Sequence, residues 1–170
     1  MSVRRVWALG AVFVFLGATS AQGLEPALVT ANAGRFNIFD GKNGRWETSW
    51  EVSFTPRRFR WFPSFVPDLS PAVGGLATEN GTLYAYGGFR FDLPLGEKWV
   101  ATPQLAAGLY YANGGRDLGG AVEFRSGIEL TRRIGERSRI GLLLYHLSNS
   151  RLYRFNPGTE SVVLTYSTRP

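Results

Sequence analysis

Residues 46–54 read Trp46-Glu47-Thr48-Ser49-Trp50-Glu51-Val52-Ser53-Phe54, with large apolar side chains on one parity and polar ones on the other. A period of two residues is that of a β-strand whose two faces differ. Residues 122–130 repeat the pattern, and their polar face carries the charges of Glu123, Arg125 and Glu129. A soluble sandwich would have to bury such charges in an apolar core, whereas a membrane barrel turns its apolar face to lipid. The alternation therefore predicts a transmembrane β-barrel.

Turn signals rich in Gly, Asn, Asp and Pro separate the alternating segments. They predict eight antiparallel strands near residues 28–39, 45–55, 70–78, 82–92, 98–111, 119–131, 138–148 and 159–168. Eight strands make the smallest class of outer-membrane barrel, whose interior is filled by side chains. If both termini lie in the periplasm, the hairpin between the last two strands faces the outer leaflet. We expect an all-β, eight-stranded antiparallel barrel in the cell outer membrane.

The N-terminus has the three parts of a secretory signal peptide. Arg4 and Arg5 form a basic start, an apolar run extends from Val6 to Leu16, and small residues follow as far as Gly23. The apolar run is too short to cross a bilayer as a helix. We expect residues 1–21 to be removed and residues 22–170 to form a single barrel domain.

Composition argues against several classes of function. The chain has no cysteine and one histidine, so a metal site is not expected. The formal net charge of +6 falls by two with the leader, and no basic run lies in a polar segment, so nucleic acid is not an expected partner. Aromatic residues make up 14% of the chain while the mean hydropathy is −0.09. This combination is typical of a membrane barrel, in which the two faces average out.

The single histidine, His146, lies two positions before Ser148. On a strand the two side chains share a face, so the imidazole could accept the proton that a nucleophilic serine loses. Glu160 opens the next strand, and antiparallel pairing returns it to the level of His146, where a carboxylate could orient the ring. His146 and Ser148 share their parity with Ile140, Leu142 and Leu144. The three candidates are therefore predicted on the lipid-facing wall, with a membrane lipid as substrate.

Two motifs in this region resemble those of a known family. The run His146-Leu147-Ser148-Asn149, followed by Asn156-Pro157-Gly158 and Glu160-Ser161, resembles the signature of the lipid A 3-O-deacylase family (PagL). The runs Asp117-Leu118-Gly119 and Glu123-Phe124-Arg125-Ser126-Gly127 are also similar to that family. The resemblance implies an outer-membrane serine esterase that hydrolyses the 3-position acyl ester of lipid A in lipopolysaccharide, without a metal or cofactor.

The resemblance also implies roles for individual residues. Ser148 would be the nucleophile, His146 the general base and Glu160 the orienting carboxylate. Asn149 would support activity by stabilising the oxyanion or shaping the site. Asn156 is a second candidate donor to the oxyanion, although a role in the turn before Pro157 is the stronger expectation.

Several alternatives stay open at the level of sequence. A phospholipase or other esterase of the same membrane, a non-catalytic structural barrel and a soluble periplasmic lipid-binding barrel share parts of the pattern. Whether the barrel forms a homodimer is also open. Residues 56–69 are predicted to form a long turn with an interfacial aromatic belt. The candidate contacts for lipid A phosphates are Lys42, Arg45, Arg116, Arg151 and Arg154. Ser150 and Arg151 depart from the small residues of the family, which leaves loop shape and acyl-chain choice in question.

Overall fold

The structure is a computed structural model that describes residues 26–39, 46–56 and 69–170. The strands in this part of the chain are β1 (Pro26–Phe36), β2 (Glu47–Pro56), β3 (Leu69–Thr78), β4 (Leu83–Phe91), β5 (Leu93–Leu95), β6 (Trp99–Tyr111), β7 (Val122–Ile134), β8 (Ser138–Ser148) and β9 (Thr159–Thr168). Among the described residues, no helix is long and apolar enough to cross a membrane.

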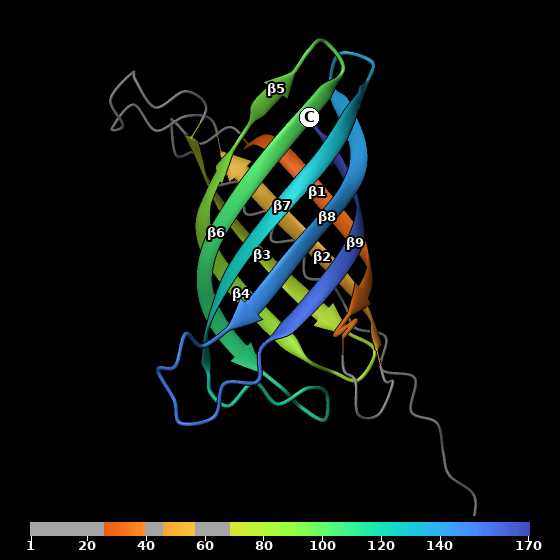
Figure 1. Cartoon of the computed structure of the whole chain (residues 1–170). Helices are drawn as coiled ribbons and strands as arrows, with labels where there is room; N and C mark the ends of the chain where they lie inside the picture. Colours follow the sequence, from red (N-terminus) through yellow and green to blue (C-terminus); the bar gives the residue numbers. More distant parts are fainter. Residues whose placement is uncertain (1–25, 40–45, 57–68) are drawn as a thin grey trace, which may run out of the picture.

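The strands close into a barrel (Figure 1). Each long strand pairs antiparallel with its neighbours in the chain, β4 pairs with β6, and β1 pairs with β9. Val29 lies opposite Thr168, so the start of β1 and the end of β9 share one end of the barrel. The short strand β5 pairs with β6 alone and extends that end. The predicted eight-stranded antiparallel barrel is confirmed.

The predicted strand boundaries agree best near the C-terminus. The bounds of β8 and β9 are those predicted, whereas β1 ends at Phe36 and not at residue 39, and β7 runs from Val122 to Ile134 and not from 119 to 131. The predicted connection between the strands at 82–92 and 98–111 contains the short strand β5. The predicted signal peptide lies outside the described residues. So does most of the segment 56–69, of which the described ends, Pro56 and Leu69, belong to β2 and β3.

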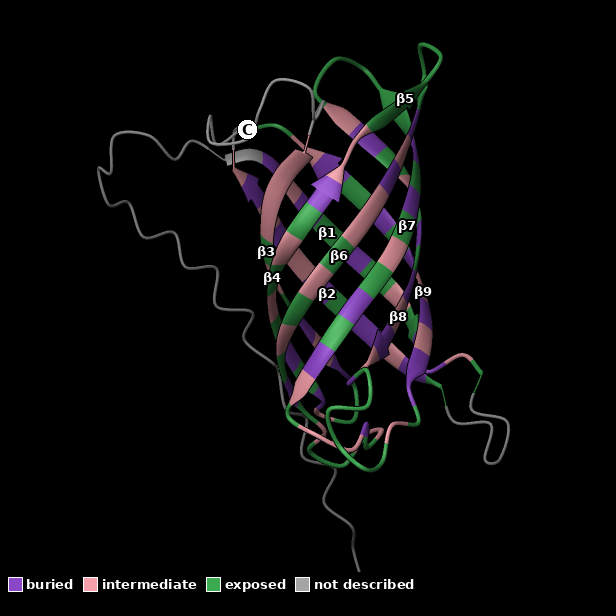
Figure 2. Ribbon diagram, turned by 60° about the vertical axis from the view of Figure 1, so that its left-hand side comes forward, coloured by how far each residue is buried: buried purple, intermediate pink, exposed green. Residues whose placement is uncertain are grey.

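Inward and outward side chains alternate along each long strand, as the bands of Figure 2 show. The barrel interior is charged in its middle. The Arg125 guanidinium donates to both carboxylate oxygens of Glu51 at 2.9 and 3.0 Å, and it lies against the rings of Tyr86 and Tyr145. The ion pair and the ring contacts compensate charges that would otherwise be costly to bury. The small barrel is therefore a packed, polar-cored scaffold.

Toward the end where β8 stops and β9 starts, an apolar cluster lies in the interior beside the buried carboxylates of Glu47 and Glu123. Leu143 and Leu147 point inward from β8 and are almost fully buried. They belong to one cluster with Phe36, Leu76, Tyr84, Tyr110, Leu118, Tyr145 and Val163. Leu118 comes from the loop between β6 and β7, so this loop is anchored in the barrel mouth. The cluster fixes the end of the barrel that carries the candidate site.

The outward face is apolar, as a wall in contact with lipid must be. Its exposed side chains include Trp50, Leu105, Leu109, Ile128, Leu130, Leu142, Leu144 and Leu164. The parity predicted for β2, β7 and β8 is thus the parity observed.

Candidate active site

Two of the predicted residues meet on neighbouring strands. His146 of β8 lies directly opposite Glu160 of β9. Its Nδ1 is 3.1 Å from Oε1 of Glu160, and both side chains are about two-fifths exposed on the outer wall. A carboxylate that accepts the Nδ1 proton leaves Nε2 unprotonated, which is the tautomer that a general base needs.

Ser148 is the third predicted residue, and it lies on the same outer face at the last position of β8. His146 and Ser148 line one groove. Within the described residues, no hydrogen bond of 3.5 Å or less joins the Ser148 hydroxyl to His146. Such contacts are often long before substrate binds. Ser148 and His146 thus lie on one surface but are not hydrogen-bonded to each other.

Gly158 lies beside the free edge of the histidine ring. A Cβ built on Gly158 would be 2.8 Å from Cε1 of His146 and 3.4 Å from Nε2. Gly158 also has a φ of 63°, in the left-handed region that favours glycine. The backbone between Asn156 and β9 can therefore approach the reactive edge of His146 because residue 158 has no side chain.

The two candidate asparagines are linked by a hydrogen bond. The Asn149 backbone N–H donates to Oδ1 of Asn156 at 3.0 Å. The buried Asn149 carboxamide points into the barrel mouth, where its Nδ2 donates to the carbonyls of Leu118 and Phe155. Both Asn149 donor hydrogens are thus directed at loop carbonyls. With its oxygen held, the Asn156 carboxamide directs its Nδ2 away from the Asn149 backbone.

A groove of about 510 Å³ runs along the outer wall from the serine. Its course follows a register row in which Ser148 pairs with Phe124, Phe124 with Ala107, and Ala107 with Gly87. The strands are steeply inclined, so a line across them from the end of β8 also moves along the barrel axis, away from the loop end (Figure 1). The groove therefore leads from the candidate nucleophile into the depth where lipid chains lie.

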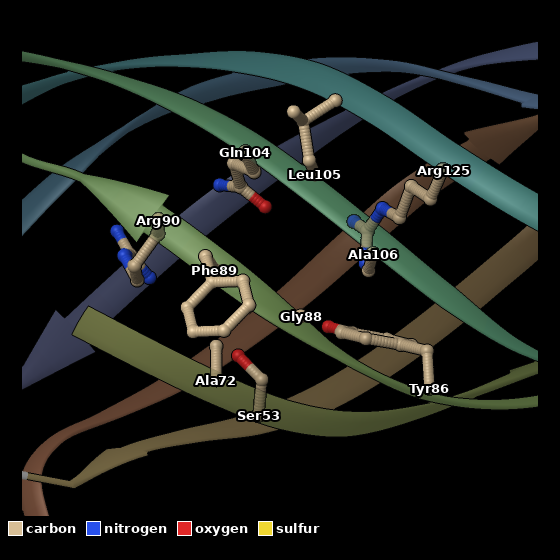
Figure 3. Close-up of a pocket in the computed structure, with 10 residues that line it drawn as sticks. All are labelled: Ser53, Ala72, Tyr86, Gly88, Phe89, Arg90, Gln104, Leu105, Ala106 and Arg125. Atoms are coloured by element: carbon tan, nitrogen blue, oxygen red, sulfur yellow. The ribbon is translucent and has the colours of Figure 1, made fainter. Parts of the chain in front are cut away.

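Small residues form the far part of this groove. A Cβ on Gly88 would lie 2.1 Å from the carbonyl oxygen of Leu105, so the backbones of β4 and β6 approach closely there. Figure 3 shows this part of the wall, with Phe89 and Leu105 on the two strands, and the Tyr86 hydroxyl donates to Glu51. The absence of side chains at Gly87 and Gly88 leaves room for the groove in this part of the wall.

Two residues of the site, Ser126 and Gly158, lie in the motifs quoted above, but no role at the site was predicted for them. Ser126 of β7 lies directly opposite His146 and lines the groove. Its parity places it on the outward face, but its proximity to His146 depends on a register that parity does not give. Gly158 was read as a turn residue, and its contact with His146 depends on the path of the loop.

Three of the predicted phosphate contacts lie in the loops that follow β6 and β8. Arg151 and Arg154 are exposed in the loop that follows Ser148, and the Arg116 backbone N–H donates to Glu47. Lys42 and Arg45 lie outside the described residues. Ser150 and Arg151 adopt φ values of 51° and 64°, which favour glycine or asparagine. This backbone explains why small residues suit these positions.

A charged interior inside an apolar wall suits a lipid environment, and a reactive group on that wall meets lipid. The fold and the site thus define a transmembrane-type β-barrel that acts on lipids. The sequence matches the family model for lipid A 3-O-deacylase (PagL) over residues 34–169, and the chain belongs to this family. Its activity is accordingly lipid A 3-O-deacylation, the hydrolysis of an ester. No curated protein sequence matches the chain.

Solved structures agree with this assignment of fold. The chain is similar to the crystal structure of the outer membrane enzyme PagL, with a TM-score of 0.62 and 19% identity over 85% of this chain and 100% of that one. It is also similar to Neisserial surface protein A (NspA), with a TM-score of 0.55 and 10% identity over 84% and 95% of the two chains. A designed transmembrane β-barrel gives a TM-score of 0.50 at 11% identity over 85% and 97%.

Proposed function

We propose that the chain removes the 3-position acyl group of lipid A with Ser148 as nucleophile, His146 as general base and Glu160 as the orienting carboxylate. The observation that carries this proposal is the pair of His146 Nδ1 and Glu160 Oε1, 3.1 Å apart, beside a serine that lines the same groove. Each of the three groups has the chemistry that its role needs. We further propose that the barrel sits in the outer membrane with these residues at the level of the outer leaflet.

The reaction begins when a rotation of the Ser148 side chain about χ1 brings its hydroxyl to Nε2 of His146. The imidazole takes the hydroxyl proton as Oγ attacks the ester carbonyl. Glu160 stabilises the imidazolium that forms. Collapse of the tetrahedral intermediate breaks the bond to the sugar oxygen, which receives the proton from His146. Water, activated by the same histidine, then hydrolyses the acyl-enzyme and releases a fatty acid.

The negative charge on the carbonyl oxygen needs a hydrogen-bond donor. Of the two candidate asparagines, Asn156 suits this role better, because the Asn149 carboxamide already donates to the carbonyls of Leu118 and Phe155. We therefore assign donation from Nδ2 to Asn156 and a supporting role to Asn149. A hydrogen-bond donor of this kind contributes about 10²- to 10³-fold to kcat.

The groove supplies a place for the acyl chain that is cleaved. It is lined by Gly87, Phe89, Leu105, Ala107 and Phe124, and it begins at His146 and Ser148. An extended chain laid in it would place its ester at the serine and its tail deeper in the membrane. This placement supports a lipid ester as substrate.

Covalent labelling tests the assignment of the nucleophile. Purified barrel in detergent is treated with a fluorophosphonate, and peptide mass spectrometry locates the label. We expect the label on Ser148, its loss in Ser148→Ala, and its retention in Ser138→Ala, a matched change at the opposite end of β8. Lipid A hydrolysis should be lost and retained in the same variants. A label on Ser126, or lipid A hydrolysis by a folded Ser148→Ala barrel, would refute the proposal.

A further inference from the structure

Two loops meet at the barrel end that carries the candidate site. The first, residues 112–121, joins β6 to β7, and the second, residues 149–158, joins β8 to β9. A Cβ on Gly119 would lie 2.0 Å from the carbonyl oxygen of Phe155, and a Cβ on Gly120 would lie 2.0 Å from ring atoms of Tyr153. Real side chains do not approach so closely. The first loop therefore accepts the second only because residues 119 and 120 are glycines.

Asn149 connects the two loops by hydrogen bonds. Its Nδ2 donates to the Leu118 carbonyl of the first loop at 2.8 Å and to the Phe155 carbonyl of the second at 2.9 Å. Its Oδ1 accepts from the Arg151 backbone N–H at 3.0 Å. The side chain is fully buried, so loss of these bonds would leave polar groups without partners. Through its own N–H, Asn149 also holds Oδ1 of Asn156.

The first loop is fixed to the barrel, so it can hold the second loop in a defined position. The Leu118 side chain is fully buried in the apolar cluster of the barrel mouth. The Tyr110 hydroxyl donates to the Arg116 carbonyl at 2.6 Å. Asp117 accepts the Gly119 backbone N–H at 2.8 Å and closes the turn. A loop that is tied to the barrel at Arg116 and Leu118, with the turn between them closed by Asp117, has little freedom to follow a moving partner.

We propose that Gly119, Gly120 and Asn149 form a loop clamp that sets the position of the Asn156 carboxamide and thereby the stabilisation of the oxyanion. The clamp residues are positioning residues, because they act through Asn156 and need not touch substrate. The inference rests on the proposed function, in which Asn156 is the donor. A displacement of about 1 Å at such a donor lowers the rate about 10²-fold, while substrate binding along the groove is unaffected.

Gly120→Ala tests the clamp, because its Cβ meets the Tyr153 ring and pushes the second loop away. We expect kcat for lipid A in detergent micelles to fall about 10²-fold with KM within about twofold. The matched control is Gly75→Ala in β3, where a Cβ meets only the Tyr84 carbonyl oxygen at 3.9 Å. The control should keep the wild-type kcat. Resistance of the folded barrel to unfolding in cold SDS shows that each variant is folded.

A double variant separates positioning from general damage. Tyr153→Ala removes the ring that the new Cβ would strike, so Gly120→Ala with Tyr153→Ala should regain the kcat of Tyr153→Ala alone. A purely destabilising effect would instead add to that of Tyr153→Ala. Should Gly120→Ala not fold, Asn149→Ser, which shortens the linking side chain, takes its place and should lower kcat with KM unchanged. A wild-type kcat in the folded loop variant, or failure of the double variant to recover, would overturn the clamp.

Different experimental results would refute the proposed clamp and the proposed function. If a folded Ser148→Ala barrel still cleaves lipid A, the proposed function is wrong whatever the loop variants do. If Ser148→Ala is inactive while Gly120→Ala retains full kcat, the function stands and the clamp alone is wrong.

Discussion

At the scale of single residues, Glu160 matters because it fixes one nitrogen of His146. Glu160→Gln retains the size of the side chain but replaces the acceptor oxygen and its charge by a carboxamide. The ring then loses both its preferred tautomer and the partner of its charged form. We expect kcat to fall by up to about 10⁴-fold, the loss seen when the acid of a serine triad becomes its amide. Steady-state hydrolysis of lipid A in micelles measures it.

The matched control for Glu160→Gln is Glu136→Gln, an exposed change in the turn between β7 and β8 at the opposite end of the barrel. It should leave kcat unchanged. Wild-type activity in Glu160→Gln would remove the carboxylate from the mechanism and leave the 3.1 Å contact with a structural role.

Gly158 acts through the space that it leaves beside His146. In Gly158→Ala the Cβ would lie 2.8 Å from Cε1 of the ring, so the imidazole must turn away from Ser148. We expect kcat to fall at least about 10²-fold, because reacting groups tolerate little displacement. Gly135→Ala is the control, since Gly135 has a similar positive φ of 73° and nothing within 4 Å of a Cβ. A wild-type kcat in the folded Gly158→Ala variant would show that the space beside His146 is not needed for the reaction.

At the scale of the element, the barrel wall from β4 to β8 forms the groove. Gly87 lies three strands from Ser148 along the register row, which is about 14 Å at the usual strand spacing. A fully extended chain advances about 1.2 Å per bond, so the row corresponds to roughly a dozen bonds. Gly87 therefore lies where the tail of a cleaved acyl chain would end.

Gly87→Leu should shorten the acyl chain that the groove accepts. A Cβ at this position meets only Val73 at 3.9 Å, so the strand itself tolerates a side chain. We expect the ratio of kcat/KM for a twelve-carbon to an eight-carbon ester to fall about tenfold, since each lost methylene contact is worth roughly 1 kcal/mol or more. Gly75→Leu, outward on β3 and outside the groove, should leave the ratio unchanged. An unchanged ratio in Gly87→Leu would place the acyl chain elsewhere.

The elements differ in how well sequence predicts them. The bounds of β8 and β9 follow from alternation and from the turn around Asn156, and a hairpin fixes which residues of its strands face one another. This is why the proximity of His146 and Glu160 could be predicted. The start of β7 was misjudged because the loop before it is held by Leu118 in the barrel mouth, a tertiary contact that local pattern does not reveal.

The groove and its surroundings could not be predicted for a similar reason. Ser126, Ala107 and Gly87 reach the site through the register between β8, β7, β6 and β4. That register is set by loop lengths and by inward packing, and parity alone is compatible with several offsets of two residues. The fold and the hairpin residues were thus accessible from the sequence, whereas the shape of the binding surface was not.

At the scale of the whole molecule, the buried ion pair of Glu51 and Arg125 holds the barrel around its middle. Glu51→Leu would leave the Arg125 guanidinium, which is almost fully buried, without its carboxylate. We expect the free energy of unfolding to fall by about 3–5 kcal/mol, measured by denaturant unfolding in detergent. Glu51→Leu with Arg125→Met should recover much of this loss, because no unpaired charge remains. If the double variant is less stable than the single one, the pair contributes through packing and not through charge compensation.

The barrel as a whole explains why the candidate site faces outward. Its interior is filled by charged and aromatic side chains and offers no room for a lipid, while the outer wall meets lipid directly. In the proposed function, a nucleophile on this wall at the loop end would reach an ester of the outer leaflet without removing the lipid from the membrane. The proposed reaction thus takes place on the lipid-facing surface of the barrel.

Mass spectrometry of lipid A from cells that express the wild type, Ser148→Ala or Ser138→Ala tests the role of Ser148 in the reaction. We expect the wild type and Ser138→Ala to remove one 3-position acyl chain from lipid A, while Ser148→Ala, folded in the membrane in equal amount, leaves it intact. Lipid A that lacks the same chain in cells with folded Ser148→Ala would contradict this role.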